Sequence, residues 1–122
     1  MPSDAETPRL FHVLSGDAQQ VRQTPYGSVG TIFTGPGLEV VWVNKQDEDV
    51  DPGWVSQPTT DILIVVQGRL RVEFADGRDD MLMTPGDLLV LPPGVRCRAY
   101  RWPRDARQGT IFLAAYSPAA AT

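Results

Sequence analysis

The sequence has little of several features that would place a chain in a familiar functional class. Its 122 residues include one cysteine, and the formal net charge is −4. A single cysteine cannot form an internal disulfide, so the chain does not require an oxidising compartment. The negative charge provides no basic surface to neutralise phosphates, and the arginines are scattered. We therefore expect no nucleic acid partner.

Long apolar runs are also missing. The longest purely aliphatic stretch, Ile62 to Val66, is far shorter than the ~20 residues of a membrane helix. The first ten residues, MPSDAETPRL, are polar and acidic and show no secretion signal or anchor. These observations predict a cytoplasmic protein that does not associate with membranes.

The composition is that of an ordinary folded domain. Hydrophobic residues make up 42% and charged residues 21%, which excludes the disordered and fibrous classes. The length suits one domain but not two. We predict a single domain over residues 10–116, with tails at residues 1–9 and 117–122, because both ends are small, polar or alanine-rich.

Short apolar stretches recur along the chain and are separated by Gly, Pro, Asp and Asn, a pattern typical of an all-β sandwich or barrel. The 11 glycines and 11 prolines leave few windows for a helix, and only Asp17 to Arg22 suits a helical turn. β-branched and aromatic residues dominate the predicted strands. These strands are Leu10 to Leu14, Gly30 to Phe33, Leu38 to Val43, Thr60 to Val66, Arg69 to Phe74, Met81 to Met83, Asp87 to Leu91, Arg96 to Trp102 and Thr110 to Tyr116.

Two turns join the middle strands. Asp76-Gly77 supplies the positive φ angles of a tight hairpin, and Gln67-Gly68 has the same character between Ile62 to Val66 and Leu70 to Glu73. The sequence therefore predicts a meander of three strands joined by two local turns.

Two stretches together resemble the cupin superfamily of small double-sheet jelly rolls. The first is GWVSQPTTDILIVVQG, residues 53–68, in which Asp61 stands at the position of the family's glutamate and Gly68 at its closing glycine. The second begins GDLLVLPPGV at residue 86 and continues past residue 97. Its glycine-proline scaffold matches the family's pattern at Gly86, Pro92 and Gly94. The resemblance implies a double-stranded β-helix, a cupin-like jelly-roll barrel.

The metal ligands that the resemblance would imply are missing. Cys97 takes the position of the family's second-motif histidine, and Arg101 that of its asparagine. The family's metal is held by three imidazoles and a carboxylate, yet the only histidine here is His12. The region that would carry the His-x-His pair contains Trp54, Val55, Ser56, Gln57 and Pro58. We predict no metal site and no other cofactor.

Strand alternation suggests what takes the place of the metal. Side chains two residues apart share a face, so Cys97, Ala99 and Arg101 would point inward together. Asp61 and Arg101 would then meet inside the barrel, since a buried carboxylate needs a partner and a guanidinium can give it two parallel bonds. Arg101 would also lower the pKa of the Cys97 thiol.

Each predicted pocket residue has a simpler alternative. Asp61 could cap a turn in solvent, Cys97 could be a small buried hydrophobe, and Trp42 could fill the core instead of flooring a cavity. No residue can be assigned a catalytic role. The ligand-binding pocket predicted from the sequence consists of Trp42, Gln57, Asp61, Cys97 and Arg101.

Three functions remain open, because the fold hosts many activities. The first is a metal-free barrel that binds a small organic ligand as a sensor, carrier or accessory subunit. The second is a metal-independent isomerase, epimerase or cyclase in which Asp61 or Cys97 moves protons. The third is a metal-dependent, dioxygenase-like protein that uses Asp61, Cys97 and a further group such as Gln57. We favour the first, and expect a homodimer because open sheet edges invite a second copy.

Overall fold

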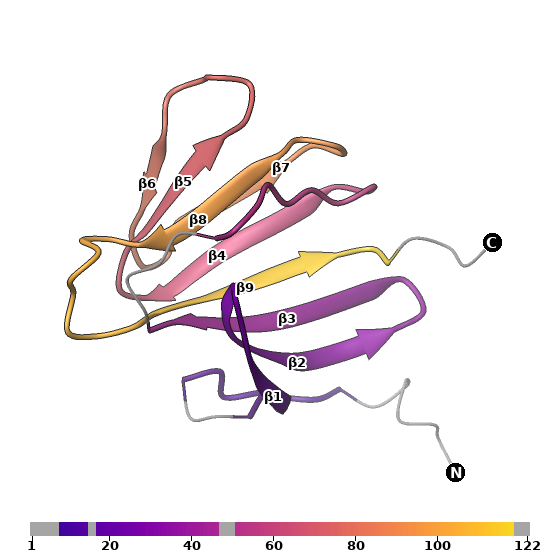
Figure 1. Cartoon of the computed structure of the whole chain (residues 1–122). Coiled ribbons are helices and arrows are strands. Elements are labelled where there is room, and N and C mark those ends of the chain that lie inside the picture. Colours follow the sequence, from indigo (N-terminus) through magenta and orange to yellow (C-terminus); the bar gives the residue numbers. More distant parts are fainter. Residues whose placement is uncertain (1–7, 15–16, 47–50, 119–122) are drawn as a thin grey trace, which may run out of the picture.

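The computed structural model describes residues 8–14, 17–46 and 51–118, and every regular element in them is a β-strand (Figure 1). The strands are β1 (Gln19–Thr24), β2 (Gly27–Gly35), β3 (Leu38–Lys45), β4 (Asp61–Gln67), β5 (Leu70–Phe74), β6 (Met81–Met83), β7 (Leu88–Leu91), β8 (Cys97–Arg101) and β9 (Thr110–Tyr116). The all-β prediction is confirmed. Residues 1–7 and 119–122 of the predicted tails lie outside the described residues. Among the described residues, no helix is long and apolar enough to span a membrane.

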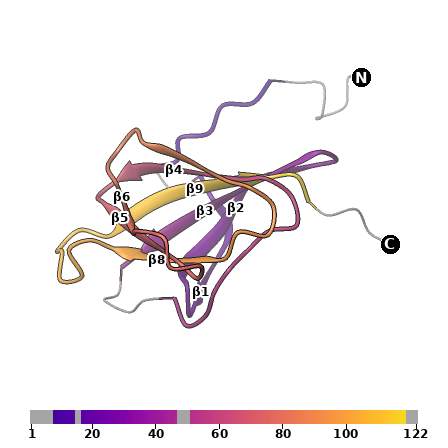
Figure 2. The same cartoon turned by 90° about the horizontal axis from the view of Figure 1, so that it is seen from above.

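The strands form two antiparallel sheets, seen from two directions in Figures 1 and 2. The larger sheet has the order β1-β2-β3-β9-β4-β7, and the smaller has the order β6-β5-β8. The last strand, β9, lies between β3 and β4, so strands distant in sequence are neighbours in space. This crossing of the chain between two facing sheets is the predicted jelly-roll arrangement.

The turn at Gly68 moves the chain from one sheet to the other. β4 pairs with β7 and β9, whereas β5 pairs with β6 and β8, so the predicted meander is wrong at this turn. Gly68 has a φ of +73°, and a Cβ there would meet Thr110 Oγ1 at 2.9 Å. That hydroxyl donates a 2.6 Å hydrogen bond to the carbonyl of Arg69. A glycine is therefore needed both for the backbone conformation and for the close approach of Thr110.

The second predicted turn is a true hairpin. β5 and β6 pair with each other, and Gly77, with a φ of +84°, donates its N–H to the carbonyl of Phe74. Asp76-Gly77 thus reverses the chain within one sheet, whereas Gln67-Gly68 takes the chain from one sheet to the other. The local turn residues do not distinguish these outcomes, because the partner strand decides them.

The apolar core lies between the sheets and follows the alternation of the strands. Val65 of β4 and both Leu70 and Val72 of β5 are fully buried, and Phe112 of β9 is nearly so. Strand periodicity alone predicts these positions, since side chains two residues apart lie on one face.

The N-terminal part departs from the prediction. Residues 10–14 form no strand, and residues 19–22 of the stretch predicted as a helical turn belong to edge strand β1. β1 has few apolar residues because it is an edge strand, so alternation could not reveal it. The segment over residues 8–14 contacts the outer face of the large sheet: the Val13 carbonyl accepts a 3.0 Å hydrogen bond from Trp42 Nε1, and Arg9 lies over the Phe33 ring.

Candidate functional site

A cavity of about 740 Å³ lies between the sheets. Its floor is the inner face of the large sheet, where cross-strand register places side chains in rows. Val41, Ala114 and Leu63 form one row, and Val43 and Phe112 belong to the next. The middle of the floor is therefore an apolar strip that spans β3, β9 and β4 and runs along these strands from the row of Asp61 to the row of Lys45.

One wall of the cavity is the segment of residues 51–57, which attaches to strand β8. Val55 and Cys97 exchange two backbone hydrogen bonds, of 2.7 and 2.9 Å. Gly94 donates its N–H to the carbonyl of Gln57 at 2.9 Å, and Gln57 also lines the cavity. The stretch that replaces the His-x-His region thus closes the barrel through backbone pairing.

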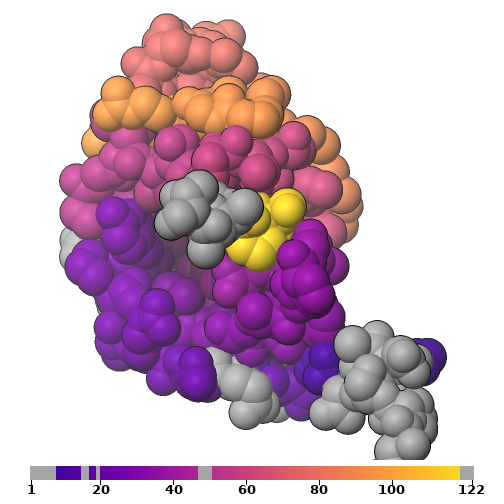
Figure 3. Space-filling model, turned by 90° about the vertical axis from the view of Figure 1, so that its right-hand side faces the viewer, coloured from indigo at the N-terminus to yellow at the C-terminus, as the bar shows by residue number. Residues whose placement is uncertain are grey.

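Asp61 lies at one end of the apolar strip, in a row with Tyr116 of β9. This end of the large sheet is the one viewed in Figure 3, where the yellow C-terminal end of β9 is visible. Asp61 is 9% exposed, and its Oδ1 is buried without a hydrogen-bond partner. Burial raises the pKa of its carboxyl to about 6, although a hydrogen bond from the Ile62 backbone opposes the rise.

Cys97 begins β8 on the opposite wall of the cavity and is buried. Burial raises the pKa of its thiol to about 11, and the carboxylates of Asp61 and Asp51 add to the rise. The prediction that Arg101 lowers this pKa is wrong. Cys97 is therefore a neutral thiol at physiological pH, with little thiolate for nucleophilic chemistry.

Arg101 is buried but does not line the cavity. Its cross-strand neighbour is Leu70, at the far end of β5, and its Nε donates a 2.9 Å hydrogen bond to the carbonyl of Arg104. Among the described residues no ion pair joins it to Asp61. Alternation predicts the face of Arg101 but not which end of the strand it occupies, and its guanidinium donates to a backbone carbonyl instead of to Asp61.

Trp42 also lies outside the cavity. Its neighbours Val41 and Val43 line the cavity floor, so the indole is on the outer face of the sheet, under the N-terminal segment. The sequence left open which face of this strand points inward. The structure assigns the inward face to the valines, and of the five predicted pocket residues only Gln57, Asp61 and Cys97 line the cavity.

Sequence reasoning missed a buried ion pair at the other end of the strip. Lys45, the only lysine in the chain, contacts the Asp51 carboxylate, and the two side chains are 5% and 8% exposed. Burial lowers the pKa of the Lys45 ammonium, while Asp51 opposes this change. Lys45 continues the alternation of Val41 and Val43, which is the signal that could have found it.

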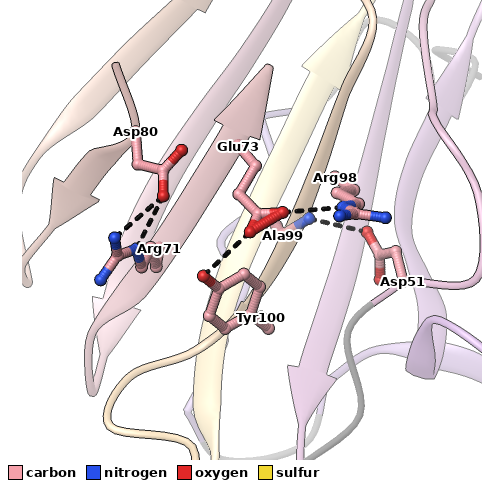
Figure 4. A network of polar contacts seen from close by, with 7 residues as sticks. All are labelled: Asp51, Arg71, Glu73, Asp80, Arg98, Ala99 and Tyr100. Atoms are coloured by element: carbon pink, nitrogen blue, oxygen red, sulfur yellow. Dashed lines mark hydrogen bonds and ion pairs between the residues drawn. The ribbon is translucent and has the colours of Figure 1, made fainter. Parts of the chain in front are cut away.

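Asp51 also ties the cavity wall to the small sheet. Its Oδ2 accepts a 3.0 Å hydrogen bond from the N–H of Ala99 in β8, as Figure 4 shows. One carboxylate thus connects the end of β3, through Lys45, to the middle of β8. This bridge lies at the end of the apolar strip opposite Asp61.

Tyr116 is a further cavity residue that the sequence did not reveal. Its hydroxyl donates a 2.6 Å hydrogen bond to Glu39 Oε2. Burial raises the pKa of Tyr116 to about 12, with the Glu39 hydrogen bond and the charges of Glu39 and Asp61 adding to the effect. The phenol therefore keeps its proton and is already engaged with Glu39.

The outer face of the small sheet carries a separate polar network (Figure 4). Glu73 accepts hydrogen bonds from Arg98 Nε at 2.8 Å and from Tyr100 Oη at 3.2 Å, and Arg71 pairs with Asp80. Arg98 also stacks over the Trp54 ring, 4.5 Å from its centroid. Arg71 and Asp80 thus pair with each other, and Glu73 balances the positive charge of Arg98.

A scan against protein-family models finds no match, and neither does a search of curated proteins. Solved structures do match. A protein of Klebsiella pneumoniae with a double-stranded β-helix domain is 18% identical, with a TM-score of 0.71 over 95% of both chains. An RmlC-like cupin of Shewanella frigidimarina is 22% identical, with a TM-score of 0.67 over 85% of this chain and 87% of that one.

The chain has the cupin fold. The KdgF protein of Halomonas sp. is similar as well, with 24% identity and a TM-score of 0.67 over 93% of this chain and 96% of that one. These TM-scores establish the cupin architecture alone at such low identities, and the prediction of a double-stranded β-helix is confirmed. The chemistry of the site has to be argued from its own residues.

The residues of this cupin barrel do not fit the metal that the fold family implies. Asp61 and Cys97 stand at two of the family's ligand positions, but one is a carboxyl with a raised pKa and the other a neutral thiol. Among the described residues, no group of three or more His, Cys, Asp or Glu side chains is arranged to hold a metal ion. One carboxyl and one neutral thiol, with no histidine in the described lining of the cavity, are a weak set for Fe, Mn, Ni or Zn, which favour imidazole, carboxylate or thiolate ligands.

Proposed function

We propose that this chain is a metal-free cupin barrel that binds a small organic ligand in its cavity, as a cytoplasmic sensor, carrier or accessory protein. The observation that carries the proposal is the buried, unpartnered Oδ1 of Asp61 at the end of the apolar strip of the cavity floor. Buried polar atoms are almost always hydrogen-bonded. A cavity-lining atom without a protein partner is therefore best explained as a contact for a bound molecule.

The size and lining of the cavity support the same proposal. Its volume of about 740 Å³ lies within the ~300–1,000 Å³ of small-molecule sites, which are mostly apolar with a few placed polar groups. Here Val41, Leu63 and Phe112 provide the apolar surface, and Asp61 and Gln57 provide polar groups.

A ligand screen by thermal shift tests the proposal with a matched pair of variants. Ala114 lines the cavity, whereas its neighbour Ala115 has no place in the lining and pairs with Val40 and Ile62. Compounds that bind in the cavity should lose their effect on Ala114→Leu and keep it on Ala115→Leu. A screen in which both variants respond like wild type would contradict binding in the cavity. A compound that binds Asp61→Ala as well as wild type would contradict the role of Asp61.

Elemental analysis of the purified protein tests the metal-free part of the proposal. We expect no stoichiometric transition metal. Stoichiometric metal would instead favour the dioxygenase-like alternative, in which Asp61, Cys97 and Gln57 would have to coordinate together.

A second candidate function is a metal-independent isomerase, epimerase or cyclase. The observation that favours it is the pKa of about 6 at Asp61, since a general acid or base is most effective when its pKa is near the working pH. Turnover of compounds from the screen decides this question. An enzyme should lose turnover in Asp61→Asn while still binding the compound, whereas a carrier shows no turnover in either protein.

We also propose a homodimer. Leu88 and Val90 of edge strand β7 are 54% and 53% exposed, and apolar side chains on an open edge favour association. Light scattering on the purified chain should give twice the monomer mass. A monomer at micromolar concentration would contradict this proposal.

A further inference from the structure

We infer that the ligand of the cavity is an uncharged, largely hydrocarbon molecule whose oxygen acceptor, such as a ketone carbonyl, accepts a hydrogen bond from the Asp61 carboxyl. A carboxylate-bearing ligand of the same length should bind more weakly, because no cation of the described residues lies near Asp61 to receive it. This inference rests on the proposed function, which it extends by naming the class of ligand.

The first step is the surroundings of Asp61. Across the described strands, the charged or titratable groups that face it are Tyr116 and Glu39 in its own row and Cys97 on the opposite wall. Leu91 of β7 and Gln57 of the cavity wall add no charge. All of these titratable groups are acids, and none can stabilise a carboxylate by ion pairing. The carboxyl therefore keeps its proton to a higher pH than in water, and below about pH 6 it has one O–H to donate.

The second step concerns the cations of the cavity. Lys45 is matched by Asp51, and Arg98, which lines the cavity as well as joining the outer network, is matched by Glu73. Arg22 also lines the cavity. It pairs with Val29, which pairs with Val43 on the next strand. Val43 is four residues along β3 from the row of Asp61, so Arg22 lies about 13 Å from that row at ~3.3 Å per residue. A ligand carboxylate near Asp61 would therefore meet another acid without a nearby cation, at a cost in both desolvation and repulsion.

The third step is the space between the two ends of the cavity. The rows of Asp61 and Lys45 are six residues apart along β3, which is about 20 Å, and the rows between them are apolar. Val41 and Val43 of β3 line this stretch with Ala114 and Phe112 of β9. A hydrocarbon chain can lie on this strip while one polar atom at its end reaches Asp61.

The experiment measures the binding of 2-octanone and octanoate by isothermal titration calorimetry at pH 5 and pH 8. The ketone should bind wild type at pH 5 and lose at least about tenfold in affinity at pH 8, because the donor proton is lost and one hydrogen bond with it. Octanoate should bind more weakly than the ketone at pH 8. Asp61→Asn keeps a neutral donor at every pH, so this variant should bind the ketone equally at both pH values.

Two further variants complete the design. Asp61→Leu removes the donor and should bind the ketone weakly at both pH values, after thermal unfolding has shown that it is folded. Asp79→Asn, which changes an exposed aspartate outside the cavity, should behave like wild type.

Equal ketone affinity at pH 5 and pH 8, or in Asp61→Leu and wild type, would overturn the inference while leaving a ligand-binding barrel intact. Tighter binding of octanoate than of the ketone at pH 8 would overturn it as well. If neither probe binds any variant, the ligand class is wrong, and the separate library screen with Ala114→Leu and Ala115→Leu decides the proposed function.

Discussion

Replacing Asp61 by asparagine should stabilise the folded protein at pH 8 and have little effect on its stability near pH 4. The folded protein holds this carboxyl with a pKa of about 6, against 3.8 in an unfolded chain. Because the folded pKa is raised, the folded state binds more protons than the unfolded state between these values, and stability falls as the pH rises through them. Above pH 6 both states are ionised, and the loss reaches its full value.

The magnitude follows from the size of the shift. Two pKa units correspond to about 3 kcal/mol at ~1.4 kcal/mol per unit, an upper value because solvent in the cavity screens part of the charge. At pH 4 the same two pKa values give only about 0.5 kcal/mol. Asp61→Asn removes the ionisation and keeps an acceptor for the Ile62 N–H. Its melting temperature at pH 8 should therefore rise by on the order of 10 °C for a chain of this length.

The assay is urea denaturation of wild type and Asp61→Asn at several pH values from 4 to 8, with Asp79→Asn as the control for removing a carboxylate from the surface. The difference in unfolding free energy should grow through pH 5 and 6 and then level off, and the control should show no such growth. A difference that is constant with pH, or a variant less stable than wild type at pH 8, would refute the view that Asp61 is buried without a partner.

Three further predictions concern other parts of the molecule. Lys45→Met leaves the Asp51 carboxylate buried without its cation and should cost about 3–5 kcal/mol of unfolding free energy. Adding Asp51→Asn should recover much of this loss. Equal losses in the single and double variants would contradict the pairing. The Cys97 thiol, with a pKa of about 11 against an ordinary 9.0, should react with a disulfide reagent at pH 7.5 at least ~100-fold more slowly in the folded protein than in guanidinium; similar rates would show an accessible thiolate. Gly68→Ala should cost at least about 1–2 kcal/mol more unfolding free energy than Gly77→Ala. Both glycines have a positive φ, but only at Gly68 would the new Cβ collide with neighbouring atoms. Equal losses of unfolding free energy, measured by urea denaturation, would contradict this reasoning.

The sequence predicts most of the fold because strand signals are local. β-branched, aliphatic and aromatic residues mark β3, β4 and β9, and the glycine-proline scaffold at Gly86, Pro92 and Gly94 marks the turn before β8. β1 is missed, since a polar edge strand has no apolar alternation. The change of sheet at Gly68 is missed as well, because it depends on a distant strand.

The site is less predictable because it depends on depth and on contacts between distant segments. Alternation predicts that Arg101 shares the face of Cys97, yet a backbone carbonyl beyond the end of the strand binds its guanidinium. Lys45 and Asp51 pair across the connection that follows β3, and a sequence pattern does not predict the path of such a connection. Asp61 is predicted as a pocket residue and does line the cavity, but its expected partner is absent.

The most direct measurement of the central claim is a crystal structure of the purified protein soaked with 2-octanone at pH 5. The account predicts the ketone on the apolar strip, with its oxygen within hydrogen-bond distance of Asp61 and no metal at Asp61 and Cys97. A transition metal bound by these two side chains, or a ketone bound outside the cavity, would contradict it.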